Sequence, residues 1–308
     1  MNSIGHNRPH PFLQLAILFG LVTMCLFLCL FIVKFSLHPL FGIADPDVFI
    51  TSLTLQKQHT YAALFMQSLA STWGMFLLPS IIFTQVMRYD VGEFFKVNRW
   101  PSFINILTAT LIIACGIVFV NFIVELNKQI PLPSALSSLR DTQGNADALI
   151  LSFFSENSNT HFFVLVLALA VLPAIAEELF FRGVIQNMLQ KSGMKAMASI
   201  VVTGLSFSVM HLEFDNFVAI WMMGIVLGWL YYYSQNLWVS IIAHFLNNFS
   251  MIALKFAFFN GVTPTDMSET TNPPVLLSLV CGIFMVVLLI WFRKRNQNAI
   301  SLSDSIDL

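Results

Sequence analysis

The sequence predicts an all-α membrane protein, a polytopic bundle of about eight transmembrane helices. Apolar residues make up 57% of the 308 residues and charged residues only 10%, and the mean hydropathy is +0.77. This composition excludes an ordinary soluble globular domain. A net charge of −1 provides no basic field for nucleic acid. The expected partners are therefore the lipid bilayer and molecules that lie at the membrane.

Long apolar segments set the number of predicted spans, because about 20 helical residues cross roughly 30 Å of hydrocarbon. Such segments occur at 11–34, 61–87, 102–126, 162–190, 198–212, 216–234, 237–257 and 275–292. The fifth segment is short, and only three residues separate the sixth from the seventh, so seven or nine spans remain alternatives. No internal repeat divides the chain, which predicts one integral membrane domain over 1–308.

Three segments need a separate interpretation. The apolar run at 11–35 exceeds the usual core of a signal peptide and lacks a small-residue cleavage site, so we expect a retained first span. Residues 90–101 mix aromatic and charged side chains, which predicts an amphipathic segment at the inner interface. Residues 131–158 form the longest polar connection and are predicted to be a plain extracytoplasmic loop.

The distribution of lysine and arginine predicts the orientation, since short loops rich in these residues stay cytoplasmic. With both termini inside, most of the fifteen lysines and arginines fall in cytoplasmic segments or next to them. These residues are Arg8, Arg88, Lys96, Arg99, Lys191, Lys195, Arg293, Lys294 and Arg295. We therefore expect a protein of the cell (plasma or inner) membrane, with residues 293–308 as a cytoplasmic tail.

Three ionisable side chains lie inside the fourth apolar segment: Glu177, Glu178 and Arg182. Each costs at least roughly 2.5–3.5 kcal/mol at the centre of a membrane helix, so each needs a partner or a purpose. Glu178 and Arg182 are four residues apart and can pair along one helix face. Glu177 is rotated from Glu178 by about 100° and is left without that partner, which favours a functional role. Pro173 removes a backbone hydrogen bond and is expected to kink or loosen the helix beside Glu177.

Later spans supply polar side chains that suit the same site. Phe207 and His211 are four residues apart, as are His244 and Asn248. A desolvated carboxylate can act as general base toward water, a histidine can hold that water, and a His/Asn pair can stabilise an oxyanion. Either histidine alone could equally be an interhelical hydrogen-bonding residue, and Asn248 alone would more often be one. Together they fit hydrolysis of an acyl bond such as a peptide bond.

One geometric difficulty accompanies this site. Counted at 1.5 Å per residue from the expected cytoplasmic helix ends, His211 lies about 20 Å deep and His244 about 10 Å deep. The two histidines can meet only if the fifth helix begins outside the membrane, if it is strongly tilted, or if the expected boundaries are shifted.

The motifs, taken together and in this order, resemble one family. Segments 177–182, 207–211 and 244–248 match EExxxR, FxxxH and HxxxN. The chain is similar here to the CPBP family of intramembrane proteases, also called the CAAX-protease, bacteriocin-processing or abortive-infection (Abi) family. The resemblance covers about 162–255, which we expect to form the catalytic core.

The resemblance implies a role for each motif residue. Glu177 would activate the water, His211 would assist it, and His244 with Asn248 would stabilise the oxyanion. Glu178, Arg182 and Phe207 would support them. No cofactor is expected, although Glu177, His211 and His244 could instead bind zinc in a metal-dependent enzyme. The implied substrate is a membrane-associated or lipidated protein or peptide; its identity, its prenylation and the oligomeric state stay open.

Two alternatives belong to other functional classes. A non-catalytic membrane immunity or scaffold protein could bind a peptide in the same cavity without cutting it. A proton-coupled transporter could use Glu177 as its carrier, but the chain lacks the inverted repeat common in such proteins. A hydrolase additionally requires a water-filled cavity, which we expect to open toward the cytoplasm.

Overall fold

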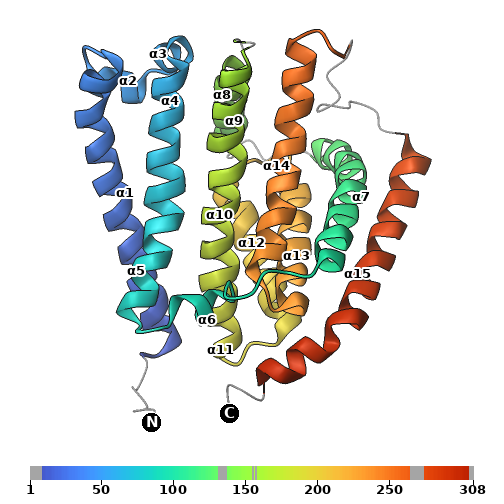
Figure 1. The fold of residues 1–308 in the computed structure, drawn as a ribbon. Helices are drawn as coiled ribbons and strands as arrows, with labels where there is room; N and C mark the ends of the chain where they lie inside the picture. Colours follow the sequence, from blue (N-terminus) through green and yellow to red (C-terminus); the bar gives the residue numbers. More distant parts are fainter. Residues whose placement is uncertain (1–8, 131–136, 155, 157, 264–273, 305–308) are drawn as a thin grey trace.

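A computed structural model describes residues 9–130, 137–154, 156, 158–263 and 274–304, and within these ranges every regular element is a helix (Figure 1). The predicted all-α fold class is confirmed. In chain order the α-helices are α1 (Pro11–Phe41), α2 (Pro46–Thr51), α3 (Leu53–Gln58), α4 (Thr60–Gln67), α5 (Leu78–Val86), α6 (Val91–Phe95), α7 (Phe103–Lys128), α8 (Ser137–Ser152), α9 (Asn159–Val166), α10 (Leu172–Glu178), α11 (Asn187–Lys191), α12 (Ala196–His211), α13 (Phe217–Ser234), α14 (Leu237–Phe259) and α15 (Val275–Asp304). Three π-helical stretches join some of them: η1 (Ser68–Leu77), η3 (Leu167–Val171) and η4 (Leu179–Gln186).

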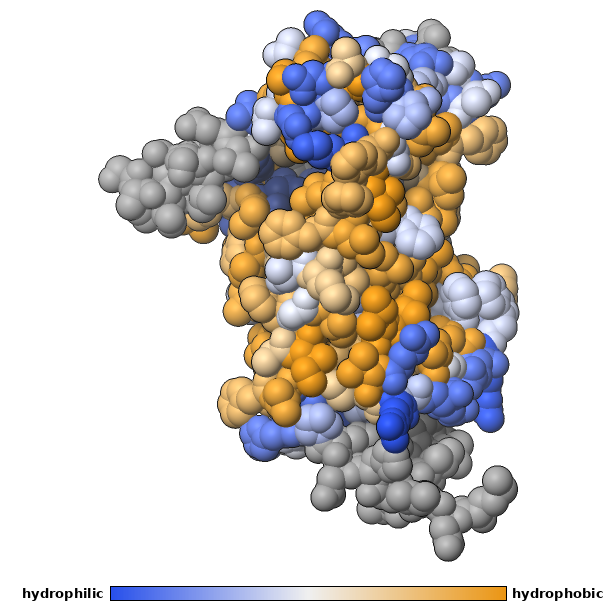
Figure 2. Space-filling model, turned by 90° about the vertical axis from the view of Figure 1, so that its left-hand side faces the viewer, coloured by the Kyte–Doolittle hydropathy of each residue, from blue (hydrophilic) through white to orange (hydrophobic). Residues whose placement is uncertain are grey.

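Seven helices of the described chain are long and apolar enough to cross a membrane. They are Pro11–Phe41, Thr60–Val86, Phe103–Lys128, Asn159–Lys191, Phe217–Ser234, Leu237–Phe259 and Val275–Gln297. The apolar helix α12 is shorter, and with it the count is eight, in line with the predicted number of about eight. Figure 2 shows an apolar band across the face in view, with hydrophilic side chains gathered toward both ends. This surface is that of an integral membrane protein, because hydrocarbon can cover only apolar side chains on helices whose backbone groups are already paired.

The fourth span is a single long helix that contains two π-helical stretches. It runs from α9 through η3, α10 and η4 to α11. Pro173 has no N–H, and its ring crowds the carbonyl four residues earlier. The preceding turn therefore widens, and the N–H of Leu172 bonds the carbonyl of Leu167, five residues back. The loosening expected at Pro173 is thus a π-helical stretch directly before the segment that carries Glu177.

Helices α12 and α13 approach each other more closely than side chains would permit. A Cβ atom added to Gly224 would lie 2.8 Å from the Cα of Gly204. One added to Gly228 would lie 2.8 Å from Gln186 Oε1. Gly204 and Gly224 therefore permit the close contact between α12 and α13, while Gly228 lets α13 approach η4.

The segment around α6 explains how His211 and His244 reach the same level. Phe94 and Phe95 are buried against the bundle, and Trp238 Nε1 donates to the Val97 carbonyl at 3.0 Å. Helix α14 therefore begins against this segment, whereas the connection between α11 and α12 lies below α6 in Figure 1. The fifth span starts farther out than the seventh, as one of the expected solutions requires.

The prediction of a plain loop at 131–158 is wrong for much of this segment. Residues Ser137–Ser152 form α8, while 131–136 lie outside the described residues. Leu149 and Ile150 near the end of this helix pack against a buried cluster that includes Phe49 and Phe153. Burial of these apolar side chains outweighs the weak helix propensity of the polar residues between 141 and 145.

Candidate active site

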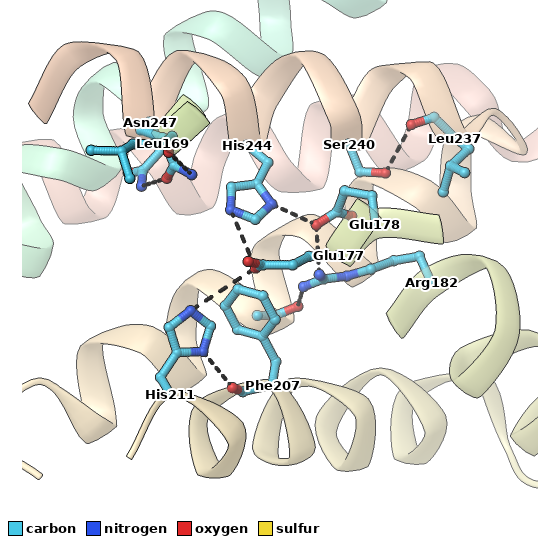
Figure 3. A network of polar contacts seen from close by, with 12 residues as sticks. Leu169, Glu177, Glu178, Arg182, Phe207, His211, Leu237, Ser240, His244 and Asn247 are labelled. Carbon is cyan, nitrogen blue, oxygen red and sulfur yellow. Dashed lines mark hydrogen bonds and ion pairs between the residues drawn. The ribbon is translucent and has the colours of Figure 1, made fainter. Parts of the chain in front are cut away.

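Glu177 faces two histidines from two other helices. Its Oε2 atom lies 4.0 Å from His211 Nε2 and 3.9 Å from His244 Nε2, as Figure 3 shows. The three side chains come from α10, α12 and α14. Their exposed fractions are 14% for Glu177, 28% for His211 and 5% for His244. The structure thus brings together three of the predicted site residues from distant parts of the chain.

Hydrogen bonds at the opposite ring nitrogens fix how the histidines face the carboxylate. His211 Nδ1 lies 2.7 Å from the Phe207 carbonyl, which can only accept, so this nitrogen donates. His244 Nδ1 lies 2.9 Å from Glu178 Oε1 and donates to that carboxylate. Each ring therefore directs Nε2 toward Glu177.

Glu178 holds two partners with one oxygen. Its Oε1 accepts from Arg182 at 2.6 Å and from His244 at 2.9 Å, and both members of the ion pair are fully buried. The pairing predicted from the four-residue spacing is present. The additional bond to His244 makes Glu178 the group that orients this histidine.

Arg182 is held from three sides. Besides Glu178, its guanidinium donates to the Gly224 carbonyl at 2.9 Å. It also lies 4.8 Å from the centre of the Phe207 ring. A buried charge of this kind is tolerable only where such partners satisfy it. Sequence reasoning missed the Gly224 carbonyl as a partner of Arg182.

Phe207 lies against both histidines. Its ring centre is 4.5 Å from that of His211 and 5.7 Å from that of His244, with an edge-on contact to the latter. Its carbonyl also accepts the His211 bond. The residue therefore shapes the site by packing and through its backbone.

Asn248 points elsewhere. Its Nδ2 donates to the Leu169 carbonyl at 3.5 Å, and its Oδ1 accepts from Asn247 at 3.2 Å. Among the described residues no hydrogen bond joins it to Glu177, His211 or His244. Figure 3 shows the Leu169 and Asn247 group apart from the histidines along α14. Its predicted oxyanion role stays a prediction.

The three donor atoms lie farther apart than the ligands of a tetrahedral zinc ion. Zinc ligands lie about 2.0–2.2 Å from the ion, which puts tetrahedral donor atoms about 3.4 Å apart. The Glu177 oxygen is 4.0 and 3.9 Å from the two ring nitrogens. Within the described part of the chain, no group of three histidine, cysteine or acidic side chains has a metal-binding arrangement.

Fold and site together define an integral membrane protein whose core holds a carboxylate facing two histidines. Residues 159–250, about a third of the chain, match the family model described as type II CAAX prenyl endopeptidase Rce1-like, which belongs to the CPBP family. This confirms the predicted resemblance for that segment, and it supports an intramembrane protease of CAAX type as the general class. No curated protein and no solved structure matches the chain significantly.

Proposed function

We propose that this protein is an intramembrane endopeptidase that hydrolyses a peptide bond of a membrane-associated or lipidated protein or peptide. One observation carries the proposal: the Glu177 carboxylate and the Nε2 atoms of both histidines converge at 3.9–4.0 Å inside the segment that matches the protease family. These separations exceed a direct hydrogen bond and suit a bridging water.

Glu177 acts as the general base. As the water oxygen attacks the carbonyl carbon of the substrate, its proton passes to the Glu177 carboxylate. The C–N bond then breaks, and the carboxyl group of Glu177 returns the proton to the departing amine nitrogen. His211 accepts a hydrogen bond from the same water at Nε2, because its Nδ1 proton is committed to the Phe207 carbonyl.

His244 stabilises the oxyanion of the tetrahedral intermediate. To donate from Nε2 its ring must carry protons on both nitrogens, and Glu178 Oε1 accepts the proton on Nδ1. Such a preorganised charged donor is worth several kcal/mol in comparable enzymes. Arg182 supports the arrangement by holding Glu178 in place.

The metal-free reaction is favoured over a zinc enzyme. The donor atoms are too widely spaced for tetrahedral ligation. In addition, Glu177, His211 and His244 can serve as the general base, the acceptor that holds the water and the oxyanion donor. A chelator is accordingly expected to leave turnover unchanged in the purified protein.

The experiment that tests this proposal uses the full chain in lipid vesicles. A quenched fluorescent peptide with a farnesylated CAAX end serves as the first probe. Termini of membrane proteins in wild-type and Glu177→Ala cells are compared in parallel to find other substrates. Glu177→Ala and His244→Ala should each lower turnover at least about 100-fold, because a general base and an oxyanion donor are lost.

The matched control is Glu213→Gln, which alters an acidic residue outside the site, in the connection between α12 and α13. The Glu213→Gln protein should cleave the farnesylated peptide at the wild-type rate. Full activity in Glu177→Ala would contradict the protease mechanism. A cellular phenotype that survives Glu177→Gln would point to peptide binding without cleavage, the alternative of an immunity or scaffold protein.

A further inference from the structure

Asn127 lies near the end of α7, outside the segment that matches the protease family. Its side-chain nitrogen donates to two successive carbonyls in the connection between α12 and α13, those of Phe214 at 2.7 Å and Asp215 at 2.9 Å. We propose that Asn127 is a positioning residue, which holds this connection and thereby keeps His211 opposite Glu177. Its effect on turnover rests on the proposed function above. Its effect on the connection does not.

His211 occupies a position that its own helix does not hold firmly. The last four carbonyls of an α-helix have no partner within the helix, so the final turn frays unless other groups secure it. His211 is the last residue of α12, and the close contact with α13 lies about two turns earlier, at Gly204. The bond from His211 Nδ1 to the Phe207 carbonyl stays within the final turn. It therefore cannot fasten that turn to the rest of the protein.

The backbone of Leu212 shows that the connection is held from outside. This residue directly follows His211 and has φ 55° and ψ 25°, the left-handed conformation. A residue with a Cβ atom is strained there, and such strain persists only where the surroundings impose it. The Leu212 side chain is 60% exposed, so its own packing does little to offset the strain. Glycine is the usual residue at this place after a helix.

Asn127 is well placed to impose this conformation. Its side chain is only 4% exposed, and its amide group carries two protons, one for each of the two carbonyls. Helix α7 packs against α13, α14 and α15, so the connection is fixed relative to α14, the helix that carries His244.

Two further bonds act on the same connection. Ser208 Oγ donates to the Phe217 carbonyl at 2.6 Å and joins the end of α12 to the start of α13. The Asp215 N–H donates to Gln143 Oε1 in α8 at 3.3 Å. The Ser208 bond stays within the α12 and α13 pair, and the Gln143 bond is longer than either bond from Asn127. We therefore expect removal of the Asn127 side chain to loosen the final turn of α12 without unfolding the helix.

Hydrogen exchange of the purified full chain in nanodiscs tests this link without any substrate. In Asn127→Ala the backbone amides of 209–212 should exchange about tenfold faster than in wild type, the size expected for the loss of two hydrogen bonds. Asn127→Leu, which also lacks a donor, replaces this variant if Asn127→Ala does not accumulate. Asn260→Ala is the matched control, because Asn260 lies at the end of α14 and its amide bonds the Phe256 carbonyl of its own helix. The control should leave the amides of 209–212 unchanged.

A substitution at Leu212 makes the test specific for the strained connection. Glycine adopts the left-handed conformation freely, so Leu212→Gly should return exchange in the Asn127→Ala protein to within about twofold of wild type. Leu212→Gly alone should not raise the exchange of these amides. Unchanged exchange in Asn127→Ala, or a rise that persists in full with Leu212→Gly, overturns the proposal.

Turnover of the farnesylated peptide shows whether Asn127 acts through His211. A positioning role predicts a lower kcat at unchanged KM in Asn127→Ala, and no further loss when the same substitution is made in a His211→Ala protein. An effect on some other part of the protein predicts the same relative loss in both backgrounds, and that result would reject the positioning role. A wild-type protein without turnover would reject the proposed function instead, and hydrogen exchange would still decide whether Asn127 holds the connection.

Discussion

At the scale of single residues, two adjacent glutamates occupy opposite chemical situations. Glu178 is fully buried and bonded to Arg182 and His244. Glu177 is partly exposed and faces only the Nε2 atoms of two histidines at distances suited to water. The first is a component of the fold and the second is available for chemistry.

This contrast predicts different outcomes for the same substitution. Glu178→Gln leaves the Arg182 charge buried without its counter-charge, which costs about 3–5 kcal/mol and should lower both folded yield and Tm. Glu177→Gln should fold with the wild-type Tm and lose turnover. Thermal unfolding of the purified proteins and cleavage of the farnesylated peptide measure the two effects. A Glu178→Gln protein as stable as Glu177→Gln would contradict the assignment.

The sequence predicts the members of this site better than their contacts. The four-residue spacing is enough to pair Glu178 with Arg182, because the helix itself brings them together. The bonds from Glu178 to His244 and from Arg182 to the Gly224 carbonyl depend on tertiary packing. Spacing on α14 likewise places Asn248 one turn from His244, but it does not reveal the contact between Asn248 and the Leu169 carbonyl.

At the scale of helices, the contact between α12 and α13 positions Arg182. Gly224 supplies the carbonyl that the guanidinium bonds, and a Cβ there would strike backbone atoms of Gly204. Gly224→Ala should therefore separate the two helices, destabilise the protein by about 1–3 kcal/mol and lower turnover. Gly116→Ala in α7 is the control, since its nearest neighbour would be Met285 Sδ at an ordinary 3.5 Å. Equal Tm values for the two variants would contradict this account.

The length of an apolar segment predicts the spans well, because a helix must be long enough to cross the hydrocarbon core. All eight expected segments are helical in the structure. The π-helical stretches and α8 could not be predicted in the same way. The winding of η3 depends on how the chain accommodates the Pro173 ring. Helix α8 forms because burial of its apolar side chains outweighs the weak helix propensity of its polar residues. The division of the chain into a catalytic core at 162–255 and a tail at 293–308 stays a prediction.

At the scale of the whole molecule, α1 begins and α15 ends at the same end of the bundle (Figure 1). The lysine and arginine pattern predicts that this end is cytoplasmic. In a cysteine-free background, Ser192→Cys between α11 and α12 should react with an impermeant maleimide only after the cells are permeabilised. Thr54→Cys in α3 should react in intact cells. The reverse pattern would place both termini outside.

Helix α12 also affects the lipid around the protein. Its 16 residues span about 24 Å at 1.5 Å per residue, less than the roughly 30 Å of a typical hydrocarbon core. Met197, Val202 and Val209 along it are exposed apolar side chains. Hydrophobic mismatch is therefore expected to thin the bilayer along this helix. His211 ends the helix and is the most exposed of the three site residues, at 28%. Such thinning is therefore expected to bring the extracytoplasmic headgroup region closer to it, on the side opposite to the expected cytoplasmic cavity.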